Sequence, residues 1–151
     1  MVEFFKNKKI TIEDVVCGDN FTVALTSDGD VYTFGYGGES KIPFLKAFLT
    51  RASGLGNGSA ESTSFPTKVE QFNKNVSQIS ASKRTVTVVT KDNEVFNWGD
   101  GSKGTFGNNS SDQQFSPVIN LHMKNLVETQ GSSIKKIKSS GNQSAVLLGI
   151  S

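Results

Sequence analysis

The sequence has little of the side-chain chemistry that catalysis requires, because it contains one histidine and one cysteine among 151 residues. A catalytic triad or a metal site needs His, Cys and carboxylate side chains in clusters. We expect His122 to be a surface or packing residue. Cys17 is expected to be a small buried apolar side chain, because the charged residues near it, Asp14 and Asp19, are acidic and would not favour a reactive thiolate. These scarcities predict a protein that is not an enzyme and that uses no cofactor or metal.

Other scarcities bear on the cellular environment. A single cysteine excludes an internal disulfide and fits an intracellular compartment, cytoplasmic or nuclear, with an organelle or a cytoskeletal assembly also open. No apolar run approaches the roughly 18 residues of a membrane span. The N-terminus does not resemble a signal peptide, because its charges follow its apolar residues. We therefore expect neither a membrane span nor a secretory signal.

The net charge of +2 is too small to indicate nucleic-acid binding by this segment. Lysines cluster beside β-patterned isoleucines near both ends, at Lys6, Lys8, Lys9, Lys135, Lys136 and Lys138. Lysine next to an exposed strand commonly prevents edge pairing, and contact with an acidic protein or with phosphate is the alternative. Two glycine-rich stretches, 35–38 and 99–104, lack the Gly-Lys-Ser/Thr order of a phosphate-binding loop and are expected to form turns.

What the sequence does contain is an internal repeat. Residues 25–35, Leu-Thr-Ser-Asp-Gly-Asp-Val-Tyr-Thr-Phe-Gly, return 64 positions later at 89–99 as Val-Thr-Lys-Asp-Asn-Glu-Val-Phe-Asn-Trp-Gly. Aligned outward, 15–18 fall on 79–82, 55–57 on 106–108 and 65–66 on 116–117, and a partial third copy runs from 134 to 148. Repeats of this kind stack and share a core. The sequence predicts two full units, 10–74 and 75–133, and a partial third, 134–151.

Each unit reads as four short strands. Phe21, Val23 and Leu25 alternate with more polar residues, and Asp28-Gly29 then supplies the positive φ angles of a tight hairpin turn. Asp92-Asn93 replaces that pair in the second unit, where Asn tolerates the left-handed region. A glycine-rich loop and a proline-led segment ending at Val69, or at 118–119, complete each unit. Such a unit is typical of one blade of a β-propeller, which makes the fold class all-β.

These motifs resemble the regulator-of-chromosome-condensation repeat family. The resemblance rests on an apolar pair before Cys17-Gly18, on Phe-Thr-x-Ala-Leu-Thr-x-Asp-Gly-x-Val-Tyr-x-Phe-Gly at 21–35, on Leu-Gly-Asn-Gly at 55–58 and on Pro66-x-x-Val69. The histidine of the family's Gly-x-x-His-Thr is absent from every copy. The structural repeat positions that the resemblance implies are Cys17, Gly18, Asp28, Gly29, Phe34, Gly35, Gly56, Trp98, Gly99 and Gly107.

The resemblance implies a seven-bladed β-propeller that acts as a platform for proteins. In the founding member it acts as a nucleotide exchange factor for the small GTPase Ran on chromatin. It also implies that Phe34 and Trp98, which share one repeat position, pack between blades. A propeller needs about 4–8 blades to close, and 151 residues supply only two to three. We therefore expect an incomplete β-propeller: a segment of a longer one, a split one completed by another chain, or a reduced module on a partner.

The first unit carries an insertion at 39–53 that the second lacks. Pro43 suits the first position of a helix, and Phe44, Leu45, Phe48 and Leu49 would share one helical face, with Arg51 off it. So short a helix needs packing to be stable. It either covers the exposed end of its own propeller or docks in a groove of a partner. In the Ran exchange factor an insertion at this position forms a wedge at the nucleotide site, without a residue-level match here.

The sequence thus favours a non-catalytic protein-binding or scaffold module, a segment or subunit of a larger assembly. The alternative is a guanine-nucleotide exchange factor for a Ran-like small GTPase, which acts by displacement rather than by bond chemistry.

Overall fold

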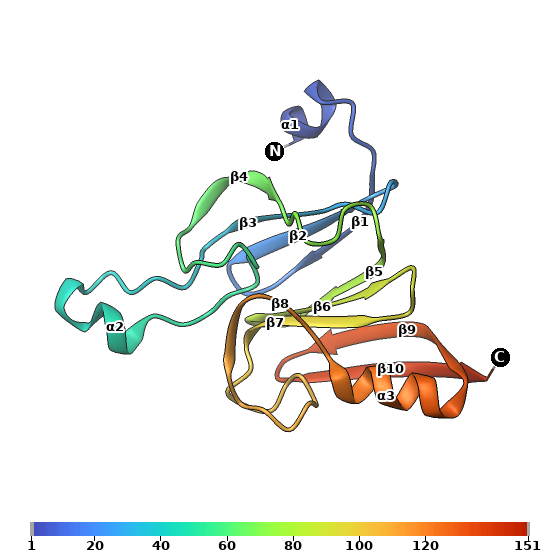
Figure 1. Ribbon diagram of the computed structural model, residues 1–151. Coiled ribbons are helices and arrows are strands. Elements are labelled where there is room, and N and C mark those ends of the chain that lie inside the picture. Colours follow the sequence, from blue (N-terminus) through green and yellow to red (C-terminus); the bar gives the residue numbers. More distant parts are fainter. Residues whose placement is uncertain (1, 151) are drawn as a thin grey trace.

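The computed structural model describes residues 2–150, which form three antiparallel sheets stacked in chain order (Figure 1). The first blade contains β1 (Ile12–Cys17), β2 (Phe21–Thr26), β3 (Val31–Gly35) and β4 (Thr63–Lys68). The second blade contains β5 (Val76–Ala81), β6 (Thr85–Thr90), β7 (Val95–Asp100) and β8 (Gln113–Ile119). The third hairpin pairs β9 (Ser132–Ser140) with β10 (Gln143–Ile150). The expected all-β, incomplete propeller is confirmed.

Helices are short and lie outside the sheets. They are α1 (Val2–Asn7), the 3-10 helix η1 (Pro43–Leu45), α2 (Lys46–Leu49) and α3 (Leu121–Gln130). Neither α1 nor α3 was expected from the sequence. In α3 the Asn120 side chain accepts a hydrogen bond from the Met123 amide, and Gly131 ends the helix in the left-handed region. His122 lies on α3 and is exposed, in agreement with the surface role expected of it.

The sequence repeat is also a repeat of strand register. Phe21 faces Gly35 across β2 and β3, and Thr85 faces Gly99 across β6 and β7. The turn after β2 needs one left-handed residue, which is Gly29 at φ 94°, and its counterpart Asn93 has φ 66°. The expectation that Asp28 also takes a positive φ is wrong. One such residue is enough because the Gly29 amide already closes the turn on the Thr26 carbonyl at 2.9 Å.

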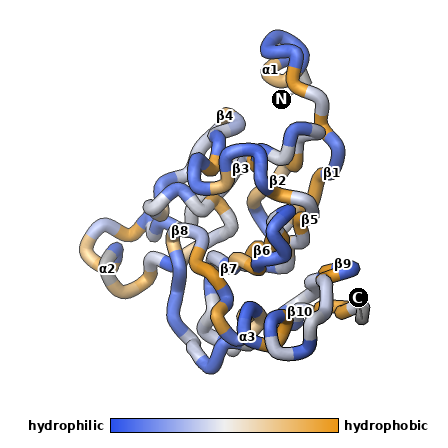
Figure 2. Tube along the Cα trace, turned by 45° about the vertical axis from the view of Figure 1, so that its right-hand side comes forward, coloured by the Kyte–Doolittle hydropathy of each residue, from blue (hydrophilic) through white to orange (hydrophobic). Residues whose placement is uncertain are grey.

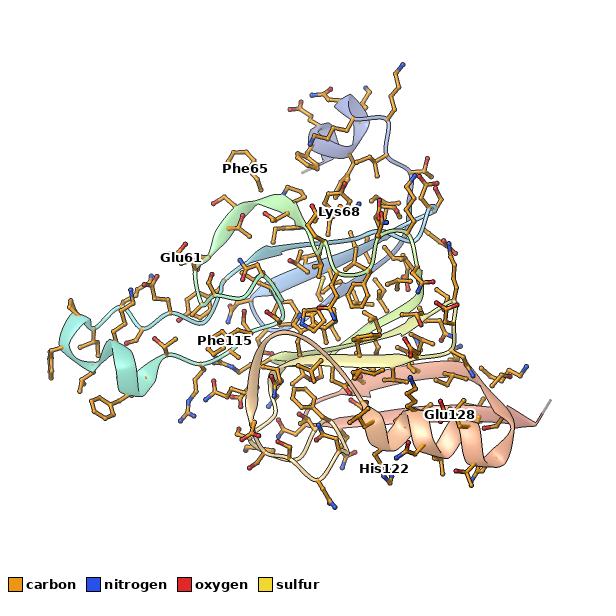
Figure 3. The ribbon with its side chains drawn as sticks, viewed as in Figure 1. Glu61, Phe65, Lys68, Phe115, His122 and Glu128 are labelled. Atoms are coloured by element: carbon orange, nitrogen blue, oxygen red, sulfur yellow. The ribbon has the colours of Figure 1, made fainter. Side chains whose placement is uncertain are left out.

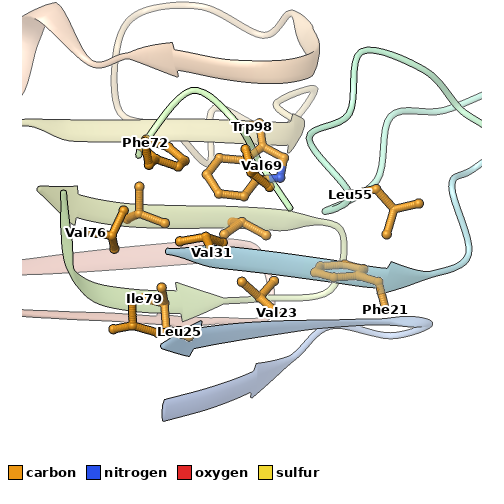
Figure 4. Close-up of a cluster of buried hydrophobic side chains, with 12 residues drawn as sticks. Phe21, Val23, Leu25, Val31, Leu55, Val69, Phe72, Val76, Ile79 and Trp98 are labelled. Carbon is orange, nitrogen blue, oxygen red and sulfur yellow. The ribbon is translucent and has the colours of Figure 1, made fainter. Parts of the chain in front are cut away.

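The first and second blades bury their facing sides in one hydrophobic core (Figure 4). At its centre Trp98 is fully buried, and its indole N–H donates to the Gly54 carbonyl at 2.9 Å. The Phe72 ring lies 5.9 Å from the Trp98 ring. The core consists of Phe21, Val23, Leu25, Val31, Leu55, Val69, Phe72, Val76, Ile79, Val86, Val88 and Trp98. A smaller cluster around Val89, Val95, Ile134 and Ile137 joins the second blade to the third hairpin.

The opposite side of the first blade, which we call its open face, is not covered by another sheet among the described residues. It carries Val15, Cys17, Thr22, Ala24 and Phe34, which are the repeat counterparts of Ile79, Ala81, Val86, Val88 and Trp98. Val15 is 48% exposed and Phe34 is half-buried. The expectation that Cys17 is buried is wrong, because Cys17 lies on this open face and is exposed.

Helix α1 covers part of the open face. The buried Phe5 ring packs edge-on against Tyr32 at 5.4 Å. Below it a largely apolar cavity of about 420 Å³ is lined by Phe5, Lys6, Ile10, Ile12, Val15, Thr22, Ala24 and Phe34. The second blade uses this side of the sheet for the main core, so the first blade retains the apolar pattern of a covered face.

We predict that Trp98→Ala lowers the free energy of unfolding by about 3–5 kcal/mol, because a large buried aromatic leaves a cavity and an unpaired Gly54 carbonyl. Trp98→Phe should cost less, since Phe34 occupies the same position in the first blade. Urea unfolding followed by circular dichroism measures both values. A Trp98→Ala cost below about 1 kcal/mol would contradict this packing role.

We also predict that the chain self-associates in solution, because exposed apolar sheet faces favour association. Val15→Lys on the open face should weaken association, whereas Leu121→Lys on α3 should not. Both residues are already exposed, at 48% and 61%, so neither change disturbs the core. Sedimentation velocity over a range of concentrations measures the effect, and a monomer at all concentrations would count against the prediction.

Candidate protein-interaction surface

Residues 36–53 form a projection from the end of β3, which we call the insertion lobe. It carries η1 and α2 and extends away from all three sheets (Figure 1). Pro43 occupies the start of η1, where its missing N–H costs no hydrogen bond. Ile42 precedes it at the N-cap without a side-chain hydrogen bond. The helical part is thus two short consecutive turns rather than one regular helix.

The tip of the insertion lobe is apolar, as the hydropathy colouring around α2 shows (Figure 2), and its large apolar side chains are exposed. Phe44 is 82% exposed and Phe48 is 77% exposed. Leu49 and Ile42 are also exposed, and Leu45 is half-buried. This exposure contradicts the alternative in which the helix covers the end of its own propeller, because its aromatic rings do not pack on the blades. The lobe therefore presents large apolar side chains to solvent.

In contrast, the base of the insertion lobe is held by hydrogen bonds within itself. The Arg51 amide donates to the Gly38 carbonyl at 3.1 Å, and the Ser40 amide donates to the Thr50 hydroxyl at 3.2 Å. The Ser53 hydroxyl donates to the Tyr36 carbonyl at 2.8 Å. These bonds join residues 36–40, which leave β3, to residues 50–53, which return from α2. We call these two hydrogen-bonded segments the neck of the lobe.

The neck is also fixed to the second blade. The Arg84 guanidinium donates to the Ala52 carbonyl at 3.2 Å, and the Ala52 amide donates to the Gln113 side-chain oxygen at 2.6 Å. Arg84 also lies 3.6 Å from the Asp100 carboxylate. Ala52 is fully buried at this junction. Contacts from the second blade thus orient the lobe, which is connected to β3 of the first blade.

Charged groups surround the apolar tip. Lys46 forms an ion pair with Glu39, and the hydrogen bond to Glu39 together with the charge of that carboxylate raises the pKa of Lys46. Lys41 and Arg51 are exposed on the same lobe. Glu61, outside the lobe, also raises the pKa of Lys46. With Glu39 paired to Lys46, the lobe itself contributes the exposed cations Lys41 and Arg51.

The sequence predicted the apolar residues of the tip but not the residues that hold the lobe in position. The predicted partner-binding residues Phe44, Leu45, Phe48, Leu49 and Arg51 all lie on the insertion lobe. The prediction omitted Ile42, although its place directly before Pro43 and Phe44 marks it as part of the same apolar patch. It also omitted Tyr36, whose hydroxyl donates to the nearby Glu39 carbonyl, and it omitted Arg84 and Gln113, which act through long-range contacts that no local pattern indicates.

The predicted repeat positions outside the lobe lie in turns, near strand ends or beside the core. The Gly18 amide donates to the Phe21 carbonyl in the turn after β1. Gly35 is the last residue of β3, Gly99 is the last but one of β7, and Asp28 is exposed in a turn. Gly56 lies against Trp98, and Gly107 is its counterpart in the second blade.

Among residues 2–150 no group of three or more His, Cys, Asp or Glu side chains is placed to hold a metal ion. No helix in that range is long and apolar enough to cross a membrane.

Sequence comparison finds relatives that are much longer than this chain and match it over a small part of their length. Residues 12–40 match the family model described as Regulator of chromosome condensation (RCC1) repeat. The chain is 31% identical over 129 residues to the E3 ubiquitin-protein ligase MYCBP2 of Danio rerio, covering 85% of this chain and 2% of the ligase. It is 32% identical over 110 residues to the serine/threonine-protein kinase Nek9 of Mus musculus, covering 70% of this chain and 10% of the kinase. The chain thus spans a small fraction of the length of these curated relatives.

Solved structures share the fold. Prp20p from Saccharomyces cerevisiae, described with its binding to Gsp1p and histones, superposes with a TM-score of 0.67 at 22% identity, covering 93% of this chain and 31% of Prp20p. Human WBSCR16 gives a TM-score of 0.64 at 21% identity, again covering 93% and 31%. Prp20 is also described as yeast RCC1. The chain therefore carries a regulator-of-chromosome-condensation (RCC1) repeat at residues 12–40, and the structural matches show that it has the fold of consecutive blades of an incomplete β-propeller.

Proposed function

We propose that the chain is a protein-binding module whose contact surface is the insertion lobe. The observation that carries this proposal is the exposure of Phe44 and Phe48 on a projection of the first blade that hydrogen bonds from the second blade hold in place. Exposed apolar patches on anchored loops are typical of interaction sites. Because the neck is already ordered, binding would cost less conformational entropy than it would for a free peptide.

The comparisons support a role within larger proteins or assemblies. The relatives include a ubiquitin ligase and a kinase, and the matched segment is 2% and 10% of their lengths. Proteins with such different activities share this repeat region, which favours a binding role for it without bond-making chemistry.

The lobe also indicates the chemistry of its partner. Two phenylalanines on successive helical turns suit an apolar groove, in the way that short amphipathic helices dock through aromatic anchors. Lys41 and Arg51 beside them favour acidic side chains along the rim of that groove. We therefore propose a partner protein with an apolar groove and an acidic rim.

We predict that Phe44→Ala combined with Phe48→Ala abolishes association with this partner, since aromatic anchors contribute roughly 2–4 kcal/mol each. The fold should persist, because the second blade forms without an insertion. The matched control is Phe65→Ala, since Phe65 on β4 is 73% exposed but lies outside the lobe (Figure 3). Co-purification from cells, circular dichroism and calorimetry with the recovered partner measure these effects. Equal affinity of the double variant and the parent would rule out the lobe as the contact surface.

A second candidate is guanine-nucleotide exchange on a Ran-like small GTPase. Two observations favour it: Prp20p, which shares the fold, is described with binding to Gsp1p, and the lobe projects after an aromatic-Gly pair, Phe34-Gly35. In this second proposal the lobe enters the nucleotide site of the GTPase and displaces the bound nucleotide.

We predict for this candidate that the chain accelerates release of a fluorescent guanine nucleotide from such a GTPase. The Phe44→Ala, Phe48→Ala variant should lose that acceleration, and Phe65→Ala should keep it. Stopped-flow fluorescence measures the release rate. No acceleration by the parent chain would remove this candidate and leave the binding role.

A further inference from the structure

A small pocket of about 100 Å³ lies where three loops meet between the second blade and the third hairpin. Its walls are the turn between β5 and β6 (82–85), the end of β7 with the loop after it (100–105), and the turn between β9 and β10 (141–142). Its volume is well below the roughly 300–1,000 Å³ of sites for whole small molecules, so the pocket suits a single chemical group. None of these residues belongs to the insertion lobe, so the inference below does not depend on the proposed function.

The pocket is positively charged. Lys83 and Arg84 line it from the turn between β5 and β6, and Lys103 lines it from the loop after β7. Asp100 is the one carboxylate in its lining among the described residues. Lysine and arginine side chains carry hydrogen-bond donors and no acceptor. The lining therefore combines three cations with one anion, and it favours a ligand that is negatively charged and rich in acceptors.

The single carboxylate is already engaged by the protein. Asp100 Oδ1 accepts a hydrogen bond from the Ser102 amide at 3.1 Å, and Oδ2 lies 3.6 Å from Arg84 Nε. The Asp100 side chain is only 16% exposed. In contrast, Lys83 and Lys103 are exposed and form no ion pair within residues 2–150. Two ammonium groups at the pocket thus lack an anion.

Arg84 is held at the wall of the pocket. Its Nη2 donates to the Ala52 carbonyl at 3.2 Å. Its Nε is buried and has no hydrogen-bond partner in the described part of the chain. A guanidinium carries five N–H donors, so the bond to Ala52 fixes its position without using up the others. The side chain is therefore placed by the protein before any ligand arrives.

The repeat itself does not require this charge. The strand register of the two blades aligns residues 83–84 with residues 19–20. These residues are Lys83-Arg84 in the second blade and Asp19-Asn20 in the first, and the same turn of the third hairpin has Gly141-Asn142. Three equivalent turns thus carry a positive charge, a negative charge and no charge. The basic pair is therefore a feature of this one site.

The equivalent space beside the first blade is nearly closed. It lies between residues 19–21 and residues 83–84, has a volume of about 30 Å³, and has Tyr36 and Ser53 of the neck in its wall. The larger pocket beside the second blade is consequently not a gap that the repeat leaves at every junction.

A phosphoryl group matches the pocket in charge and size. A phosphate monoester carries about −1.5 to −2 charges at pH 7 and offers three strong acceptor oxygens. Arginine and lysine bind phosphate through charge-assisted hydrogen bonds. Nucleic-acid binding needs a series of cations along a backbone, whereas the lysines of β9, at 135, 136 and 138, do not line this pocket. The group that fits is thus a single phosphate monoester.

We propose that this pocket binds the phosphoryl group of a phosphate monoester, which is either a phosphorylated side chain of a partner protein or a free phosphate ion. The ammonium groups of Lys83 and Lys103 bind its oxygens, and Arg84 adds positive charge from the wall. Asn142 offers its side-chain amide from the third hairpin. The bound group then joins the second blade to the third hairpin.

Titration of the isotope-labelled chain, followed by amide chemical shifts, tests the site. The probes are the peptide Gly-Gly-phosphoserine-Gly-Gly with blocked ends, the same peptide with serine, and inorganic phosphate. We expect the phosphopeptide to shift residues 82–85, 100–105 and 141–142, which form the pocket, and the serine peptide to shift none of them.

The two phosphate probes distinguish the source of the group. Binding of the phosphopeptide at least about tenfold tighter than that of inorganic phosphate assigns the pocket to a phosphorylated side chain. Comparable or tighter binding of inorganic phosphate assigns it to the free ion. If neither probe shifts these residues at about 10 mM, the proposal is overturned.

Two double variants that lose the same charge provide the control. Lys83→Gln with Lys103→Gln removes both ammonium groups of the pocket, and Lys135→Gln with Lys136→Gln removes two from β9. All four lysines are exposed, so none of the changes disturbs the core. The pocket variant should bind the tighter phosphate probe at least about tenfold more weakly, and the β9 variant should bind it within about twofold of the parent. Equal weakening would overturn the proposal, because binding would then depend on net charge alone.

A last arm uses an oligothymidine without terminal phosphates, which offers phosphodiesters only. At equal ionic strength the chain should bind it more weakly than the better phosphate monoester probe, because the cations of the pocket converge on one group. Tighter binding of the oligonucleotide, with shifts in the same three segments, would overturn the proposal in favour of a nucleic-acid ligand.

Discussion

Packing of an aromatic side chain from one blade against the glycine turn of the preceding blade is the contact on which this stack depends. Trp98 reaches across the interface, donates to the Gly54 carbonyl and lies so close to Gly56 that a Cβ there would collide with the indole. The side chains of Phe72 and Val86 enclose it in the same core. Because each aromatic needs the turn of a neighbour, one blade of this type cannot complete its core alone.

The two ends of the stack follow from that dependence. At the first blade, Phe34 stands at the position of Trp98 but has no preceding turn to contact among the described residues, so it remains half-buried and Cys17 on the same face is exposed. At the other end the second blade has its turn glycine, Gly107, and apart from its chain neighbours no described residue has a heavy atom within 4 Å of a Cβ built there. Both ends therefore resemble an interface between blades. The first blade carries the aromatic residue of that contact, and the second blade carries the glycine turn.

The insertion lobe shows how a blade accepts extra sequence without loss of this contact. Strand β3 keeps the register of β7, and the added residues leave and return at a neck closed by a hydrogen bond from the Arg51 amide to the Gly38 carbonyl. Arg84 and Gln113 of the second blade bind the same neck. The apolar residues at the tip are consequently free of the core, which separates the surface proposed for binding from the residues that stabilise the fold.

The sequence by itself determined the repeat, its period-two strands, the turn at Gly29 and Asn93 and the place of the insertion, because these depend on neighbouring residues and on backbone sterics. The sequence also contained the two capping residues of α3, Asn120 and Gly131. The helix was nevertheless not predicted, because the strand pattern on both sides of it dominated the interpretation. Only the tertiary structure decided that Cys17 is exposed, that the lobe points outward and that Gly107 borders a cavity. The physical reason is that burial at a repeat position depends on whether a neighbouring blade covers it, and identical local patterns carry no information about that neighbour.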